Sequence, residues 1–204
     1  MITILLALTA NAEPSILQTG LFHGDEVVVP MGSSKWMALA EGPEGAMAGW
    51  VDVVIDRACD PVVDGAGEAT GVRVSVPGLD SVLLLVRGID GLTEGRLTTL
   101  EIGPTPITAP LALGVFTLEV ADPPLALLLK AGEVVQTLAT PKRTPSGPWP
   151  VLLWAGDWDG DGRPDLLLDL ADHPNMDATT LFLSSRATGT QLVAPVATLV
   201  TTGC

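Results

Sequence analysis

The chain has 204 residues, enough for one domain with a sizeable core or for two small domains, and a single domain is favoured. Its 24 acidic and 10 basic residues give a formal net charge of −14 at pH 7, which argues against nucleic acid or anionic membranes as partners. Apolar runs such as residues 82–86 and 125–129 are much shorter than the roughly 20 residues of a transmembrane helix. We therefore expect no transmembrane segment and interpret these runs as buried strands.

A short apolar segment begins the sequence. Residues 1–12 end in Ala10-Asn11-Ala12, directly before the polar break at Glu13-Pro14. This pattern resembles the apolar region and the cleavage site of a secretory signal peptide, although the basic segment that normally precedes them is missing. We expect residues 1–12 to be a signal peptide and the protein to be secreted, periplasmic or on the cell surface of a bacterium. The alternative is an ordinary first β-strand.

Short β-type segments separated by turn residues make up the next part of the chain, and no stretch shows the 3.6-residue period of an amphipathic helix. The 22 glycines and 17 prolines mark the turns. The proline-rich segment 104–110 predicts an extended connector or an edge segment, because proline has no N–H to donate to a ladder. We expect strands at residues 26–29, 35–40, 50–56, 71–76, 81–87 and 96–102.

Two hairpins are expected around Asp122-Pro123-Pro124. Residues 114–120 lead into this break, and residues 125–129 are expected to pair with residues 134–139 through a short turn. The segment that follows is rich in proline and is the best candidate for a linker. The predicted organisation is a signal peptide at 1–12, a β-sandwich-like region at 13–139, a proline-rich connector at 140–150 and a C-terminal unit at 151–204.

The C-terminal unit has the pattern strand, acidic loop, strand, followed by two further strands at residues 179–184 and 191–201. Four strands joined by short loops are expected to form one antiparallel sheet. The predicted fold class is therefore all-β: an antiparallel, sandwich-like domain whose C-terminal four-stranded sheet carries one calcium loop.

The acidic loop has carboxylates at relative positions one, three, five and nine, namely Asp157, Asp159, Asp161 and Asp165. This spacing turns carboxylate oxygens toward one hard cation, and Ca²⁺ is the best match for such a set. Arg163 is expected to contribute its backbone carbonyl. Four converging carboxylates without a metal repel one another and raise their pKa values, so we expect the ion to have a structural role.

Other cation loops fit the segment less well. An EF-hand requires a bidentate glutamate at relative position twelve, where this chain has Leu168, and the flanking segments are β-type. Mg²⁺ is disfavoured because it retains its waters and rarely accepts a cage made only of protein ligands. Gly160 and Gly162 permit the tight curl that the loop needs.

Residues 156–168 resemble the calcium loop of FG-GAP or VCBS-type repeats, which are strand-loop-strand hairpins of integrin-type β-propellers. The resemblance implies Ca²⁺ binding by Asp157, Asp159, Asp161 and Asp165, with Arg163 contributing through its main chain. It covers about fifteen residues, or about fifty if the last four strands form one blade-like sheet, which makes residues 151–204 an FG-GAP/VCBS-like four-stranded calcium-binding unit. A propeller needs roughly four or more blades, and the chain has one such loop. We therefore expect either a loop carried by another β-fold or a fragment of a larger protein.

The tryptophans support two hypotheses. Trp158, at the second loop position, is expected to be a hydrophobic plug beneath the loop, and strand alternation predicts that Trp154 shares a face with Leu152. A carbohydrate-binding hypothesis depends on tryptophans that are candidates for exposed platforms: Trp36, Trp50 and Trp149.

The two cysteines, Cys59 and Cys204, fit an oxidising compartment. We expect an intramolecular disulfide between them, which would close a very long loop and stabilise the fold by about 5 kcal/mol in the chain-entropy model. The alternative is a pair of free thiols in a reducing compartment.

No catalytic motif is present in the sequence. His23 and His173 are interpreted as loop residues, and Ser184 and Ser185 as turn residues. A second set of aspartates lacks the glycine pattern and is interpreted as strand-edge and turn residues: Asp52, Asp56, Asp60 and Asp64.

The functional hypothesis is an exported, calcium-binding β-domain. It would act as a non-enzymatic surface, adhesion or interaction module with an unknown protein or glycan ligand. The alternative is a carbohydrate-binding module or an accessory module of a secreted hydrolase that uses calcium structurally.

Overall fold

The computed structural model describes residues 13–24, 26–100, 102, 105–108, 110–141 and 150–202. These residues form an all-β protein of three antiparallel sheets, so the predicted fold class is confirmed. The one helical segment in these ranges is the three-residue 3₁₀ helix η1 (Ser184–Arg186). Among the described residues, no helix has the length and the apolar composition needed to span a membrane.

The first sheet contains β1 (Ser15–Leu17), β2 (Gly20–Phe22), β3 (Gly32–Gly42), β4 (Gly45–Ala58), β5 (Gly71–Ser75), β6 (Val82–Arg87) and β7 (Gly95–Arg96). Its strand order is β1-β6-β3-β4-β5-β2, with β7 paired to β4. The edge strands β1 and β2 are separated only by Gln18 and Thr19. Because the chain advances at most about 3.6 Å per residue, the sheet must curl until its two edges lie close together.

The second and third sheets follow in the sequence. The second has the order β10-β11-β12-β13, built from β10 (Leu111–Leu113), β11 (Phe116–Ala121), β12 (Ala126–Ala131) and β13 (Val134–Ala139). The third has the order β17-β16-β15-β14-β8 with β9 on β14, built from β8 (Thr98–Thr99), β9 (Thr105–Pro106), β14 (Val151–Asp157), β15 (Asp165–Asp169), β16 (Met176–Leu183) and β17 (Ala194–Thr202).

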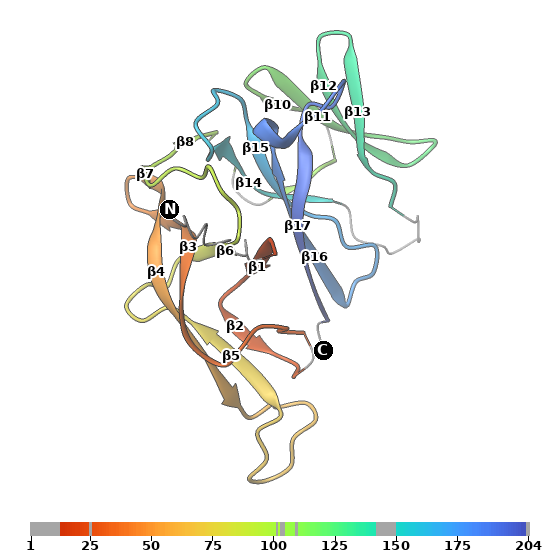
Figure 1. The fold of residues 1–204 in the computed structure, drawn as a ribbon. Helices are drawn as coiled ribbons and strands as arrows, with labels where there is room; N and C mark the ends of the chain where they lie inside the picture. Colours follow the sequence, from red (N-terminus) through yellow and green to blue (C-terminus); the bar gives the residue numbers. More distant parts are fainter. Residues whose placement is uncertain are drawn as a thin grey trace, which may run out of the picture.

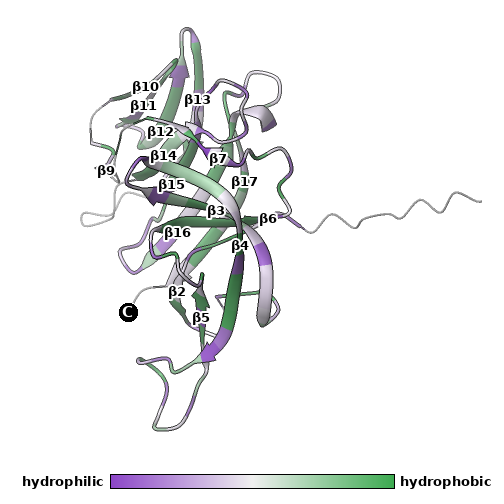
Figure 2. Ribbon diagram, turned by 90° about the vertical axis from the view of Figure 1, so that its left-hand side faces the viewer, coloured by the Kyte–Doolittle hydropathy of each residue, from purple (hydrophilic) through white to green (hydrophobic). Residues whose placement is uncertain are grey.

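The third sheet is the middle layer, drawn mostly in blue between the red-to-yellow first sheet and the green second sheet in Figure 1. Leu167 and Leu181 belong to the core shared with the first sheet. Leu166, Leu168 and Phe182 belong to the core shared with the second sheet. A sheet buried on both faces has continuous apolar strands, which explains the leucine run of β15. In Figure 2, hydrophobic colour runs along most of the strands.

Most of the predicted strands are present. The hairpin of β12 and β13 is confirmed, and β11 pairs with β12 across the Asp122-Pro123-Pro124 break. The four predicted C-terminal strands form one antiparallel sheet, β14 to β17, and two short strands from earlier in the chain extend it. One of these is β9, which comes from the proline-rich segment 104–110 and pairs at an edge position as expected.

Two strand predictions were wrong. Residues 26–29 form no strand, because the backbone N–H of Glu26 bonds the His23 carbonyl in a turn and the Glu26 side chain accepts the His23 N–H. The predicted strand 96–102 is broken into β7 and β8. The chain crosses between layers here, since β7 pairs with β4 of the first sheet and β8 pairs with β14 of the third.

Some sequence-based expectations fall outside the described residues. These are the signal peptide at 1–12, most of the connector at 140–150, and the residues Trp149 and Cys204. Cys59 is exposed and forms no disulfide with any described residue. Because Cys204 lies outside the described residues, the disulfide between the two cysteines stays a prediction. Both cores contain residues from the region 13–139 and from the unit 151–204.

Trp154 and Leu152 do not share a face, contrary to the alternation expected for β14. The register between β14 and β15 shifts between these two residues, so that one extra residue is accommodated. Leu152 consequently lies in the second core and Trp154 in the first.

We expect Gly156→Ala to destabilise the protein by about 1–3 kcal/mol, the usual cost of overpacking. A β-carbon at Gly156 would lie 2.5 Å from Cζ2 of Trp154 and 2.6 Å from the carbonyl oxygen of Thr98. Gly49→Ala in β4 is the matched control, because a β-carbon there would meet no heavy atom within 4 Å. Urea denaturation at fixed Ca²⁺ compares the two variants, and equal free energies of unfolding would contradict the packing described here.

Candidate metal centre

The acidic loop connects β14 to β15 in the middle layer. The ladder between these strands ends at the pair Gly156 and Asp165, so the loop begins and closes at one point of the sheet. Four of the seven residues of β14 and four of the five residues of β15 are buried, and the others are partly buried. The base of the loop is therefore held in place by the two hydrophobic cores.

Three carboxylates of the loop converge. Asp157, Asp159 and Asp165 each place one oxygen within 4.8 Å of the other two. Asp165 is fully buried, and the other two are partly buried. Calcium–oxygen distances are about 2.3–2.6 Å, so two oxygens on one ion lie at most about 5 Å apart. The three carboxylates therefore fit a single Ca²⁺ ion.

Backbone N–H groups curl the loop around these carboxylates. Asp157 accepts from Gly160 N at 2.8 Å and from Gly162 N at 3.0 Å. The two glycines have φ angles of +75° and +83°, a region that side chains with a β-carbon rarely adopt. This is the role predicted for them. A carboxylate has about four acceptor positions, so Asp157 retains lone pairs for a cation.

Asp165 is the most heavily bonded of the three. Its carboxylate accepts hydrogen bonds from Trp158 N and Ser184 N, each at 2.8 Å, and lies 3.1 Å from the Ser184 hydroxyl oxygen. Burial raises the pKa of Asp165 to about 7, and the negative charge of Asp159 adds to this although the donors oppose it. A bound cation would favour the ionised carboxylate and release the proton.

Asp161 and Arg163 are placed differently from the three converging carboxylates. Oδ2 of Asp161 pairs with the Arg163 guanidinium at 2.9 Å, and Oδ1 lies 2.9 Å from the Ser184 hydroxyl. Burial raises the pKa of Asp161, but donation from the Arg163 backbone and guanidinium outweighs burial and leaves the pKa below its ordinary value. Through Ser184, Asp161 still lies next to Asp165.

Residues from other segments fasten the loop, and sequence analysis missed them. Ser184 and Ser185 were expected to be turn residues, but they lie in the 3₁₀ helix η1. There the backbone N–H of Ser184 donates to Asp165, and the backbone N–H of Ser185 lies 3.4 Å from Asp159. Thr93, between β6 and β7, donates to the Trp158 carbonyl through its N–H at 2.8 Å and its hydroxyl at 2.7 Å. Nothing in the local sequence marks these residues, because the contacts depend on the tertiary fold.

The tryptophans differ in their exposure. Trp158 is fully buried, which confirms the plug beneath the loop, and its ring meets Trp154 edge-on with centroids 6.2 Å apart. Trp50 is 54% exposed and remains a candidate platform. Trp36 was a wrong candidate, because it is fully buried beneath the Arg87 guanidinium, 4.7 Å from its ring centroid.

The second set of aspartates is structural, as expected. Asp52 and Asp56 are exposed in β4. Asp60 is buried and accepts hydrogen bonds from the backbone N–H of Val62 and from His23 Nδ1, the latter at 2.5 Å. The Val62 bond is the larger cause of a lowered Asp60 pKa, and His23 adds to it. His173 is exposed and accepts a hydrogen bond from Asn175 N, which fits a loop residue.

Asp64→Asn is expected to destabilise the protein at neutral pH and to have a smaller effect in acid. The Asp64 carboxylate accepts from the Thr70 hydroxyl and also from the backbone N–H groups of Asp60 and Thr70, so its pKa is lowered. A carboxylate of this kind contributes stability above its unfolded pKa of about 3.9 and loses it as the pH falls through the folded pKa. Urea denaturation at neutral pH and at about pH 3 tests this; an effect of Asp64→Asn that is equal at both pH values would contradict it.

Comparison of the chain with protein-family models, with curated proteins and with solved structures gave no match.

Proposed function

We propose that the protein is a calcium-binding β-domain whose acidic loop holds one structural Ca²⁺ ion. The observation that carries this is the convergence of Asp157, Asp159 and Asp165 on one point. Carboxylate oxygens are the ligands that Ca²⁺ prefers. Asp161 and the backbone carbonyl of Arg163 are the further ligands that we propose, and water completes the coordination.

The contacts of the loop support a structural role for the ion. Thr93 binds the loop from the β6–β7 connection, and Ser184 binds it from η1. Ca²⁺ would neutralise the carboxylates that these segments enclose and would stabilise all three segments together. The strand-loop-strand hairpin of β14 and β15 also agrees with the proposal that residues 156–168 are a single FG-GAP or VCBS-type repeat.

We propose that this domain is exported and acts as a non-enzymatic surface, adhesion or interaction module. The support is the leader-like segment 1–12, the acidic net charge of −14 and the absence of catalytic motifs from the sequence. Trp50, half-exposed on β4, supports the alternative of a carbohydrate-binding module or a hydrolase accessory module.

Luminescence of Tb³⁺ tests the metal site directly. Tb³⁺ replaces Ca²⁺ in oxygen-rich sites and emits when a nearby tryptophan is excited, and Trp158 lies within the loop. We expect emission that Ca²⁺ suppresses by competition and that Asp157→Asn abolishes. Emission that is unchanged by Ca²⁺ or by this substitution would contradict the assignment.

Export is tested by expressing residues 1–204 in a bacterial host and sequencing the N-terminus of the recovered protein. We expect a periplasmic product that begins at Glu13. A product that keeps residues 1–12 and stays in the cytoplasm would contradict export by this segment.

A further inference from the structure

Four aspartates of the chain are directly followed by glycine: Asp64, Asp90, Asp159 and Asp161. At such a pair the main-chain nitrogen of the glycine can attack the side-chain carboxyl carbon of the aspartate, because glycine has no β-carbon in the way. The new N–C bond closes a succinimide ring, and the amide proton leaves with the carboxyl hydroxyl as water. A second water molecule opens the ring. Opening at the main-chain carbonyl gives isoaspartate, whose main chain contains one extra carbon atom.

The first of these pairs is held by hydrogen bonds in the β4–β5 loop. The backbone N–H of Gly65 donates to the Glu68 carboxylate at 2.8 Å. The Asp64 carboxylate accepts from the N–H and the hydroxyl of Thr70. Ring closure requires both groups, so these hydrogen bonds must break before it can occur.

The two pairs in the metal loop are held in a similar way. The N–H groups of Gly160 and Gly162 donate to the Asp157 carboxylate at 2.8 and 3.0 Å. The Asp161 carboxylate is also paired with the Arg163 guanidinium. The folded loop therefore protects its own Asp-Gly sequences from ring closure.

The fourth pair, Asp90-Gly91, is not held in this way. It forms a turn between β6 and β7, and both residues are exposed. Within the described part of the chain, the Asp90 carboxylate and the Gly91 N–H have no hydrogen-bond partner. A β-carbon at Gly91 would meet no heavy atom within 4 Å, and Asp90 borders a hollow of about 490 Å³. The ring therefore has room to form, and water reaches it.

The same segment supports the metal loop. Arg186 donates to the main-chain carbonyl of Asp90 at 2.7 Å. Three residues further on, Thr93 donates twice to the Trp158 carbonyl, at 2.8 and 2.7 Å. One extra main-chain carbon in residue 90 lengthens the chain between these two anchors, so the support that Thr93 gives to the loop is disturbed.

We propose that Asp90 is the site at which the folded protein converts spontaneously to isoaspartate, and that this conversion weakens the binding of Ca²⁺ by the metal loop. The second part of the proposal rests on the proposed metal site, and the first part does not.

Long incubation of the native full chain in CaCl₂ at neutral pH, followed by tryptic digestion and mass spectrometry, tests the first part. Trypsin places Asp90 in peptide 88–96 and Asp64 in peptide 58–73, and the two loop aspartates lie in a third peptide. We expect at least about tenfold more isoaspartate at Asp90 than at the other three sites, the effect of one hydrogen bond that must break first. In urea, all four sites are expected to convert at similar rates, because the fold no longer protects any of them.

Asp90→Glu is the matched control. It keeps the charge but would have to close a six-membered ring, which forms far more slowly, so this position is expected to stay unconverted. In the native wild-type chain, conversion at any other Asp-Gly site as fast as at Asp90 would overturn the first part. An unconverted Asp90, over a time in which the urea-unfolded chain converts, would overturn it as well.

Isothermal titration of fresh and incubated protein with CaCl₂ tests the second part. We expect at least about fivefold weaker binding after incubation of the wild type, the lower range of coupling between two sites, and no change for incubated Asp90→Glu. Equal affinity of the fresh and the converted wild type would overturn the coupling. Absence of Ca²⁺ binding to the fresh chain would contradict the metal site, and the second part with it, but not the first.

Discussion

Excess Ca²⁺ is expected to raise the melting temperature by about 5–10 °C relative to a chelator. A ligand that binds only the native state stabilises it by about 2.7 kcal/mol at 100 times its Kd. For a chain of this length, each kcal/mol raises the melting temperature by about 2–4 °C. The physical cause is relief of the repulsion among Asp157, Asp159 and Asp165. Differential scanning calorimetry in CaCl₂ and in EGTA measures the difference.

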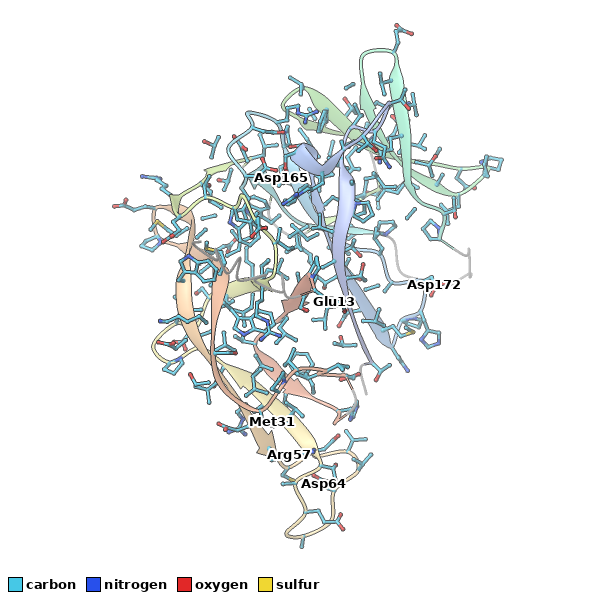
Figure 3. All side chains as sticks on the ribbon, in the orientation of Figure 1. Glu13, Met31, Arg57, Asp64, Asp165 and Asp172 are labelled. Carbon is cyan, nitrogen blue, oxygen red and sulfur yellow. The ribbon has the colours of Figure 1, made fainter. Side chains whose placement is uncertain are left out.

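Asp159→Asn should remove this difference, because it deletes one converging charge while it keeps the size of the side chain. Asp172→Asn is the matched control, since Asp172 is an exposed aspartate well apart from Asp165 in Figure 3. If the Asp159→Asn variant still melted at a higher temperature in CaCl₂ than in EGTA, the ion would bind somewhere other than the acidic loop. Identical wild-type melts in CaCl₂ and EGTA would show that any bound ion adds no stability.

Alanine at Leu166, Leu167 or Leu168 is expected to destabilise the protein by about 2–5 kcal/mol in each case. All three side chains are fully buried, the middle one in the core toward the first sheet and the other two in the core toward the second. In a two-layer sandwich, alternate residues of a strand face solvent and tolerate truncation. A large loss of stability on alanine substitution at three consecutive positions is therefore expected only for a strand in a middle layer.

Urea denaturation measures these free energies of unfolding. Val200→Ala is the control, because this residue is 48% exposed in β17 of the same sheet. We expect it to change the free energy of unfolding by less than about 1 kcal/mol. A near-neutral effect at any one of the three leucines would contradict the arrangement of the layers.

Sequence patterns predicted the features that depend on neighbouring residues. The β12–β13 hairpin and the order of strands from β14 to β17 follow from short apolar runs and turn residues. The curl of the acidic loop follows from Gly160 and Gly162, whose positive φ angles have a local cause. The plug formed by Trp158 also follows from its position in the motif.

Features that depend on the meeting of distant segments could not be predicted. Leu97 lies where the chain leaves the first sheet for the third, and no local signal distinguishes this crossing from one continuous strand. The register shift that separates Leu152 from Trp154 depends on the pairing partner in β15. The run of three leucines in β15, residues 166–168, indicated burial, but it did not indicate that two different sheets provide it.

The metal loop contains one feature that the sequence predicted and another that depends on a distant segment. Its spacing predicted four carboxylates around one cation, and the structure brings three of them together. Asp161 is turned toward Arg163 and Ser184, and the serine comes from a segment about twenty residues further along the chain. The sequence pattern did not predict the ion pair between Asp161 and Arg163, because it assigned Arg163 a role only through its backbone carbonyl.

Isothermal titration of metal-free protein with CaCl₂ tests the central claim most directly. We predict one Ca²⁺ ion per chain, no binding to the Asp159→Asn variant, and much weaker binding of Mg²⁺, which demands a smaller octahedral site and retains its waters. Absence of Ca²⁺ binding to the wild-type chain, or binding that Asp159→Asn leaves unchanged, would contradict the assignment of the acidic loop as a calcium site.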